Sequence, residues 1–271
     1  MDNKRTFLEV NFTGASVLKL YNEDCLDTMA RMEDNFIDLT VTSPPYDNLR
    51  TYNGYSFDFE SIAKELYRVT KEGGVVVWIV GDATIKGSET GTSFKQALFL
   101  KECGFRLNDT MIYQKANFIP LTHKRYEQEF EYMFVFSKEK PKSFNPLMID
   151  CIHAGKTIKR SRKTNEIGIG LRETQTSLKT KDKKQKGNVW KYNTGGYNTA
   201  NHVAQFPEQL ANDHIISWSN ENDIVYDPFM GSGTTAKMAI LNNRNWIGSE
   251  MSSEYCDIAE KRIKETQQRL F

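Results

Sequence analysis

The sequence predicts an α/β fold with a doubly wound parallel sheet, and three patterns support this prediction. Strand-like and helix-like stretches alternate through most of the 271 residues, which is typical of a parallel sheet with helices on both faces. The run VVVWIV at 75–80 is apolar throughout, as expected of a strand buried on both sides. A glycine-rich turn at 227–235 joins a short strand to a helix, a connection at which open α/β sheets often bind ligands.

Each expected element has a local signal. Apolar runs predict strands at 16–21, 36–42, 75–80, 108–114, 130–137, 224–226 and 246–249. Apolar residues at helical spacing predict helices at 25–33, 59–71, 92–103, 208–218, 234–242 and 254–270. Pro44-Pro45 should end the second strand and Gly73-Gly74 the second helix. The strands at 108–114 and 130–137 should be neighbours.

The composition is that of a globular chain, and the sequence shows no pattern for disulfides, a metal site or a membrane segment. Apolar residues make up 39% and charged residues 26%, which argues against a disordered chain. The four histidines show no metal-ligand spacing, and no CxxC pair occurs among Cys25, Cys103, Cys151 and Cys256. Neither a signal peptide nor a run of about 18 apolar residues is present. We therefore expect a soluble, intracellular protein without a metal site.

Positive charge is concentrated in one part of the chain. The chain has 36 basic and 35 acidic residues, whereas residues 155–191 have 12 and 3, a local charge of +9. The remainder then has 24 against 32, or −8. The surrounding stretch, 138–191, is polar, basic and poor in aliphatic residues. Such a run can be a solvated loop, but its place inside an α/β chain favours a functional insertion that binds a polyanion.

The turn DPFMGSGTT at 227–235 has the features of a nucleotide-type site. Gly231 and Gly233 would let the backbone approach a ligand closely, and the following helix would present free N–H groups to it. Glu250 ends the next strand, nineteen residues after Gly231, where an acidic residue can accept hydrogen bonds from ribose hydroxyls. A third glycine and a GxxxxGK[ST] phosphate loop are absent. The expected ligand is an adenosine derivative without a pyrophosphate.

The pentapeptide TSPPY at 42–46 follows the second strand, where ligands bind in such sheets. Taken alone it could be a proline-rich turn. Its prolines, Pro44 and Pro45, fix the backbone and supply no N–H donors. They leave the Pro44 carbonyl and the Ser43 hydroxyl as acceptors beside the flat ring of Tyr46. A planar amine, such as the exocyclic amine of a nucleobase, suits this arrangement.

Together these motifs resemble those of the amino-methylating DNA methyltransferases that use S-adenosylmethionine. TSPPY is similar to their catalytic [DNS]-PP-[YFW] motif, and DPFMGSGTT is similar to their cofactor loop. Three further segments resemble the family around the cofactor: YNEDCLDTM at 21–29, HVAQFPEQL at 202–210 and WIGSEMSSEYCDIAEKRI at 246–263. The resemblance spans nearly all of the chain outside the basic insertion.

The order of the motifs resembles the β group of that family, of the restriction-modification type. The catalytic motif comes first, then the insertion, then the cofactor loop. This implies a Rossmann-like methyltransferase sheet with circularly permuted motif order and an inserted target-recognition region. The expected parts are a catalytic half at 1–137, the recognition insertion at 138–191 and a cofactor-binding half at 192–271. The N-terminal strand must then continue the sheet, which brings Asp24 beside Glu250.

The resemblance also implies which residues do what. The catalytic motif is Ser43, Pro44, Pro45 and Tyr46, with Tyr46 stacking on a base flipped out of the duplex. The residues expected to hold S-adenosylmethionine are Asp24, Cys25, Thr42, His202, Phe206, Asp227, Pro228, Phe229, Gly231, Ser232, Gly233, Thr234, Glu250 and Met251. Those expected to contact DNA are Lys159, Arg160, Arg162, Lys163, Lys181, Lys183, Lys184 and Lys186.

Serine at the first motif position is typical of the N4-cytosine enzymes in that family, and aspartate of the N6-adenine enzymes. Ser43, with Phe206-Pro207, therefore favours cytosine N4, and adenine N6 is the alternative. Carbon-5 methylation of cytosine needs an attacking cysteine, and the family that carries it out has a Pro-Cys pair in its catalytic loop. None of the seven prolines here precedes a cysteine, so this chain does not resemble that family. Two further alternatives are a methyltransferase acting on RNA or a small molecule, and a nucleic-acid-binding protein with a vestigial catalytic fold.

The expected partner is duplex DNA, in the cytoplasm at the nucleoid. The sequence leaves open whether a separately acting restriction endonuclease is a second partner, and whether the chain is a monomer or a homodimer.

Overall fold

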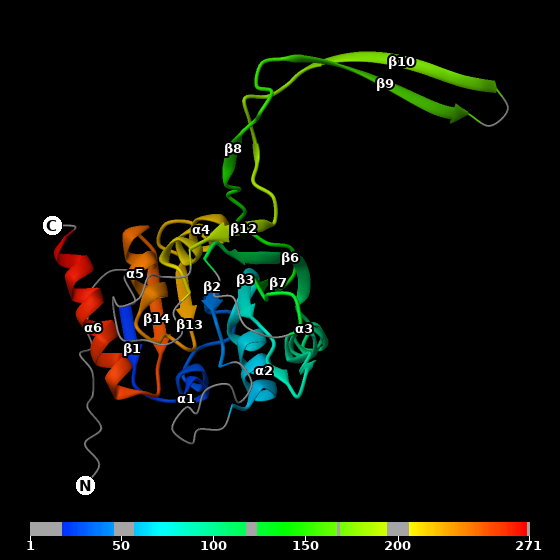
Figure 1. Cartoon of the computed structure of the whole chain (residues 1–271). Helices are drawn as coiled ribbons and strands as arrows, with labels where there is room; N and C mark the ends of the chain where they lie inside the picture. Colours follow the sequence, from blue (N-terminus) through cyan, green and yellow to red (C-terminus); the bar gives the residue numbers. More distant parts are fainter. Residues whose placement is uncertain (1–17, 46–56, 118–123, 167–168, 194–205, 270–271) are drawn as a thin grey trace, which may run out of the picture. The chain divides into compact units, whose positions relative to one another are not determined.

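A computed structural model of the chain describes residues 18–45, 57–117, 124–166, 169–193 and 206–269, with the backbone alone between 158 and 178 (Figure 1). Contacts divide the chain into a larger unit, residues 1–145 and 188–271, and a smaller unit, residues 146–187. Residues 138–145 and 188–191, which the sequence placed in the recognition insertion, thus belong to the larger unit.

The larger unit is built on a sheet in which eight strands are described, in the order β1-β14-β13-β2-β3-β7-β6-β12 (Figure 1). The strands are β1 (Leu18–Tyr21), β2 (Ile37–Thr42), β3 (Thr70–Val80), β6 (Arg106–Lys115), β7 (Phe130–Ser137), β12 (Val189–Tyr192), β13 (Ile224–Asp227) and β14 (Asn245–Ser249). Neighbouring strands are parallel except where β7 pairs with β3 and β6. The expected pairing of 108–114 with 130–137 is confirmed. The sheet is mixed and not parallel throughout, because β7 follows β6 along the chain and runs back beside it.

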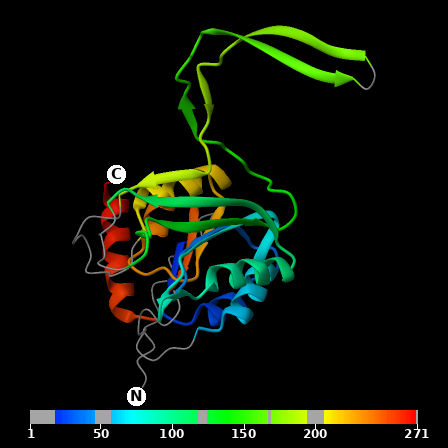
Figure 2. The same ribbon diagram turned by 45° about the vertical axis from the view of Figure 1, so that its right-hand side comes forward.

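Two helical layers cover the sheet, as the doubly wound prediction requires (Figures 1 and 2). One contains α1 (Cys25–Ala30), α2 (Phe59–Val69) and α3 (Thr92–Glu102), and the other α4 (Glu208–Trp218), α5 (Thr234–Leu241) and α6 (Ser253–Gln268). The short strands β4 (Thr84–Ile85) and β5 (Ser88–Glu89) pair with each other. Among the helices described, none is long and apolar enough to cross a bilayer.

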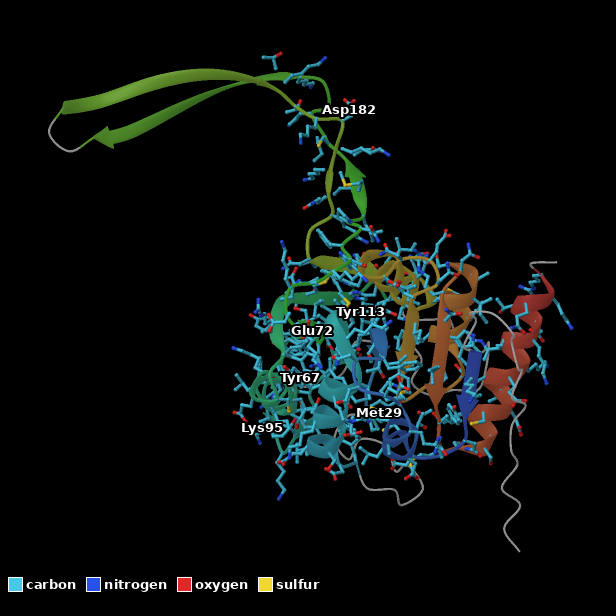
Figure 3. All side chains as sticks on the ribbon, turned by 180° about the vertical axis from the view of Figure 1, so that it is seen from behind. Met29, Tyr67, Glu72, Lys95, Tyr113 and Asp182 are labelled. Atoms are coloured by element: carbon cyan, nitrogen blue, oxygen red, sulfur yellow. The ribbon has the colours of Figure 1, made fainter. Side chains whose placement is uncertain are left out.

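The core lies between the sheet and these layers. The apolar run of β3 is buried from Val75 to Val80, as predicted. Its Trp78 is fully buried and donates from Nε1 to Oε1 of Gln96 on α3, at 2.9 Å. Met29 of α1 and Tyr67 of α2 belong to the α1–α3 layer (Figure 3). Met29 is fully buried, and the rings of Tyr67 and Phe105 are edge to face with their centroids 5.1 Å apart. Such aromatic pairs add to the stabilisation that burial provides.

Gly73-Gly74 lies inside β3 and does not end α2, which stops at Val69. The Gly73 N–H donates to the Lys138 carbonyl at 2.6 Å, and the Lys142 N–H donates to the Gly73 carbonyl at 2.9 Å. A Cβ atom on Gly73 would lie only 2.8 Å from Cβ of Lys142. The glycine therefore permits the segment after β7 to cross close to the strand.

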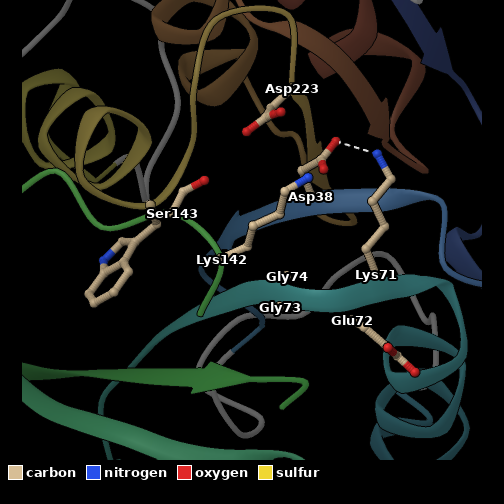
Figure 4. Close-up of a pocket in the computed structure, with 9 residues that line it drawn as sticks. Asp38, Lys71, Glu72, Gly73, Gly74, Lys142, Ser143 and Asp223 are labelled. Carbon is tan, nitrogen blue, oxygen red and sulfur yellow. Dashed lines mark hydrogen bonds and ion pairs between the residues drawn. The ribbon is translucent and has the colours of Figure 1, made fainter. Parts of the chain in front are cut away.

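This crossing borders a small polar hollow (Figure 4). Within it, the Lys71 ammonium lies 2.6 Å from the Asp38 carboxylate, which also accepts the Ile224 N–H at 2.9 Å. Asp38 and Asp223 stand at the amino ends of β2 and β13. The hollow is therefore at the opposite edge of the sheet from the two sequence motifs.

The smaller unit consists of two antiparallel ribbons. In one, β8 (Met148–Asp150) pairs with β11 (Lys183–Gln185), and in the other β9 (Thr157–Glu166) pairs with β10 (Ile169–Lys179). The sequence predicted no strand here, because a two-stranded ribbon does not need an alternating apolar face.

Candidate active site

Four parallel strands bring the predicted site segments to one edge of the sheet. Asp24, Ser43 and Glu250 follow the carboxyl ends of β1, β2 and β14, and Asp227 ends β13. The helices after β13 and β2 belong to different layers, so the winding of the sheet reverses between these two strands. Such a switch point is where open α/β sheets bind their ligands.

A buried carboxylate joins the two motifs at this point. Asp227 is 1% exposed, and its Oδ1 accepts the Thr42 hydroxyl at 2.7 Å and the Phe229 N–H at 3.0 Å. Its Oδ2 accepts the Thr235 hydroxyl at 2.7 Å. Burial raises the pKa of Asp227 to about 6, although these hydrogen bonds favour the charged form. The geometry favours a positioning role for the Asp227 and Thr42 side chains over direct contact with a ligand.

The glycine loop is a tight turn that only glycine adopts without strain. Gly231 and Gly233 have φ angles of 51° and 82°, in the left-handed region. A Cβ atom on Gly233 would lie 3.0 Å from Cβ of Ala259 on α6. The Gly231 N–H donates to Oε2 of Glu250 at 2.8 Å. The loop is therefore held between α6 and the end of β14.

Glu250 connects three parts of this edge. Its Oε1 accepts the Ser252 N–H at 2.9 Å, while its own N–H donates to the Tyr21 carbonyl at 2.9 Å. The Asn22 amide donates to the Glu250 carbonyl at 2.8 Å. The predicted place of the N-terminal strand beside the last strand is thus confirmed. Burial raises the pKa of the Glu250 carboxyl.

The arrangement fits an adenosine-type ligand. Each Glu250 oxygen accepts one backbone N–H and has a further lone pair for a ribose hydroxyl. No residue from Asp227 to Thr235 is basic, which agrees with a ligand lacking phosphates. Phe229 adds an apolar wall, with its ring edge-on to Phe57 at 5.7 Å and to Trp78 at 6.3 Å.

The other expected cofactor residues differ in their surroundings. Asp24 caps α1 by accepting the Leu26 N–H at 2.8 Å. Cys25 is 4% exposed, and burial raises the pKa of its thiol far above the usual range. Pro228, Ser232 and Thr234 are buried, Phe206 is half-buried and Met251 is exposed. His202 lies outside the described residues.

In the catalytic motif, Ser43 and Pro45 are half-buried and Pro44 is buried, while Tyr46 lies outside the described residues. The eight residues expected to contact DNA all belong to the smaller unit. Lys181, Lys183 and Lys184 are exposed and Lys186 is half-buried, whereas Lys159, Arg160, Arg162 and Lys163 lie on β9. Within the described ranges, no group of His, Cys, Asp and Glu could hold a metal ion.

Arg262 is a site residue that sequence reasoning missed. From α6 it donates to the Ser232 carbonyl at 2.6 Å, to the Ser232 hydroxyl at 2.7 Å and to Oε1 of Glu208 at 2.8 Å. Lys237 of α5 donates to the same Glu208 oxygen at 2.6 Å. Burial would raise the pKa of Glu208, but these cations outweigh it and lower the pKa below its ordinary value. The available signal was a charged residue three positions after Ala259, on the face of α6 that meets the loop.

Comparison with known proteins agrees with this geometry. A family model described as DNA methylase, of the N6/N4 type, matches residues 37–261. The orphan methyltransferase M.BamHII of Bacillus amyloliquefaciens is 57% identical over 240 residues, which cover 85% of this chain and 90% of that protein.

Two solved structures extend the likeness to the fold. The M1.HpyAVI–SAM complex is 25% identical with a TM-score of 0.63, covering 91% of this chain and 99% of that one. The PvuII DNA methyltransferase, described as cytosine-N4-specific, is 21% identical with a TM-score of 0.67, covering 96% of each chain. The family model spans most of the sequence, so this chain belongs to the N6/N4 DNA methylase family.

Proposed function

We propose that this chain transfers a methyl group from S-adenosylmethionine to the N4 amine of cytosine, at a specific site in duplex DNA. Family membership gives DNA methylation and its methyl donor. The contact that best supports the proposal is the 2.7 Å hydrogen bond from Thr42 to Asp227. It holds the start of the catalytic motif against the glycine loop, and a direct transfer needs amine and methyl donor side by side.

The catalytic motif would act by positioning and electrostatics. An exocyclic amine is a poor nucleophile, because its lone pair is delocalised into the ring. If the Ser43 hydroxyl and the Pro44 carbonyl accept the two amino hydrogens, the lone pair is directed away from the ring. S-adenosylmethionine supplies an electrophilic methyl group when bound. No covalent enzyme intermediate is needed.

The choice of base depends on Ser43 and on Phe206-Pro207, by their resemblance to the N4-cytosine enzymes. Nucleoside analysis of DNA from cells that express the chain tests it. We expect N4-methylcytosine at one recurring sequence. Detection of N6-methyladenine instead would support DNA methylation but contradict the assignment of cytosine as the target base. Unmodified DNA would contradict the proposed function. The same assay on RNA distinguishes the RNA-methylating alternative.

We further propose that the smaller unit contributes target recognition and that its lysines contact phosphates. An enzyme of this kind would work on chromosomal DNA, in the cytoplasm. Duplex binding should weaken with salt, with a slope of about −0.9 per phosphate contact. Replacing Lys181, Lys183, Lys184 and Lys186 by glutamine should reduce that slope. An unchanged slope would mean that these four lysines do not contact phosphates and that other residues bind the DNA.

Replacing Tyr46 by alanine should reduce methyl transfer by roughly tenfold or more while cofactor affinity persists. The change removes the stacking face for the flipped base, and stacking is worth about 1–3 kcal/mol per base. Tyr46→Phe keeps that face and serves as the matched control. Single-turnover methylation with cofactor titration measures both effects. Equal losses in the two variants would mean that the hydroxyl, not the ring, matters.

Replacing Arg262 by methionine should weaken cofactor binding by roughly tenfold, because Ser232 loses two charge-assisted hydrogen bonds that fix the loop. Lys237→Met is the matched control, since Lys237 also binds Glu208 but lies on α5, outside the bonds that Arg262 makes to Ser232. Calorimetric titration with S-adenosylmethionine compares them. A similar loss of affinity in both variants would locate the effect in Glu208 and not in the loop.

A further inference from the structure

The hairpin of β9 and β10 has its arginines at positions of one face. Its register pairs Arg160 with Thr176, Arg162 with Thr174 and Arg172 with Thr164. Residues directly opposite each other in an antiparallel pair share a face, and every second residue along a strand returns to it. The three arginine–threonine pairs therefore occupy three successive rows of one face. The row before them pairs Ile158 with Leu178.

The lysines occupy the other face. The remaining pairs are Thr157–Lys179, Lys159–Ser177, Ser161–Gln175 and Lys163–Glu173. In the rows from Thr157 to Thr164, one face thus has three arginines and no lysine, and the other has three lysines and no arginine. Glu166 follows at the tip, beyond a register shift between Ile169 and Arg172.

Arginine and lysine differ in what they recognise. The planar guanidinium of arginine can donate two parallel hydrogen bonds to O6 and N7 of guanine in a fixed geometry, whereas the lysine ammonium reaches such atoms as a flexible point charge without that planar fit. Threonine can bond to base edges and can contact the thymine methyl group. A face of arginine–threonine rows therefore suits base recognition. The other face, with three lysines against Glu173, has a positive charge that suits attraction without sequence preference.

We propose that the β9–β10 ribbon enters the major groove of the target DNA with the Arg160, Arg162 and Arg172 face toward the base edges. This inference rests on the proposed function. The major groove is about 12 Å wide and admits a two-stranded ribbon. Rows on one face are about 6.8 Å apart, at two residues of about 3.4 Å each. Because base pairs are about 3.4 Å apart along the duplex, neighbouring rows would then address alternate base pairs, and the target should contain guanines. The lysine face is turned away from the bases and contributes charge alone.

The test compares two triple variants of the full chain. R160K/R162K/R172K keeps every charge and removes only two-point donation, while K159Q/K163Q/K179Q removes charge from the other face. For the arginine variant we expect the ratio of cognate to non-cognate DNA affinity to fall by roughly 5- to 150-fold per lost guanine contact. The salt dependence should stay as in the wild type. For the lysine variant, both affinities should fall together, with a smaller salt slope.

Either of two results would overturn the inference: an arginine variant that keeps the wild-type affinity ratio, or a lysine variant that loses it. Titration with S-adenosylmethionine checks that the larger unit of each variant is folded, and an unchanged affinity for non-cognate DNA checks the ribbon of the arginine variant. The target sequence is taken from modified-base sequencing of the wild type. If the wild type modifies no DNA, the proposed function fails, and selection of bound duplexes from a random pool still tests the ribbon separately.

Discussion

Replacing Gly231 by aspartate is expected to abolish S-adenosylmethionine binding and methyl transfer. The residue has a φ angle of 51° and a buried position, so any side chain strains the turn by about 1–2 kcal/mol. Aspartate would also place a carboxylate close to that of Glu250, whose Oε2 accepts the Gly231 N–H at 2.8 Å. Like charges at such a separation repel strongly in a partly buried site. Calorimetric titration should show affinity reduced by roughly 100-fold or more.

Gly87→Asp is the matched control for this variant. Gly87 also has a left-handed φ, of 81°, but no atom lies within 4 Å of a Cβ atom built on it. The control therefore introduces the same residue and a similar backbone strain in the β4–β5 turn, where the added Cβ atom meets no neighbouring atom. We expect it to lose some thermal stability and to keep wild-type cofactor affinity. If Gly231→Asp bound the cofactor as tightly as Gly87→Asp does, the loop would not be the cofactor site.

The elements that could be predicted are those whose buried residues form a regular apolar pattern in the sequence. Helix α4 and strand β7 have the predicted bounds, because their buried residues repeat at helical spacing or run continuously. The direction of β7 was not predictable, since an apolar run is the same for a strand in either direction. β12 was missed because only Trp190 and Tyr192 are buried in it, within a stretch dominated by charge.

The predictable part of the site is what the backbone requires. The two glycines of the loop and the two prolines of the catalytic motif can be recognised from the sequence alone, because each fixes or permits a particular backbone conformation. The roles of Asp227 and Arg262 could not be predicted in this way, because each depends on a partner in another part of the chain. Thr42 is 185 residues from Asp227, and Ser232 is 30 residues from Arg262. Local sequence can place Arg262 on the same face of α6 as Ala259, but it does not identify Ser232 or Thr42 as the partners, because those contacts depend on how α6 packs and on the order of the strands.

Replacing Asp227 by alanine should destabilise the protein by on the order of 4 kcal/mol and separate the two motifs. The change leaves the hydroxyls of Thr42 and Thr235 and the Phe229 N–H without their acceptor in a buried place. Asp227→Asn is the matched control. Its amide oxygen can accept from Thr42 and Phe229, and its NH2 can donate to the Thr235 hydroxyl, which donates on to the Val41 carbonyl at 3.3 Å. We expect this variant to fold and to retain cofactor binding.

The wild type and the Asp227→Asn variant should then differ in how stability depends on pH. Burial raises the pKa of Asp227 from its ordinary 3.8 to about 6, so the folded wild type binds this proton more tightly than the unfolded chain does. The stabilisation from that proton is fully present below about pH 4 and is lost as the pH rises through 6. The amide of the variant does not titrate, so the free energy of unfolding of Asp227→Asn relative to the wild type should rise by about 3 kcal/mol between pH 4 and pH 7. Denaturant unfolding of both proteins across this range measures the difference. A difference that stays constant with pH would mean that Asp227 is charged throughout, held by Thr42 and Thr235 more strongly than burial opposes it.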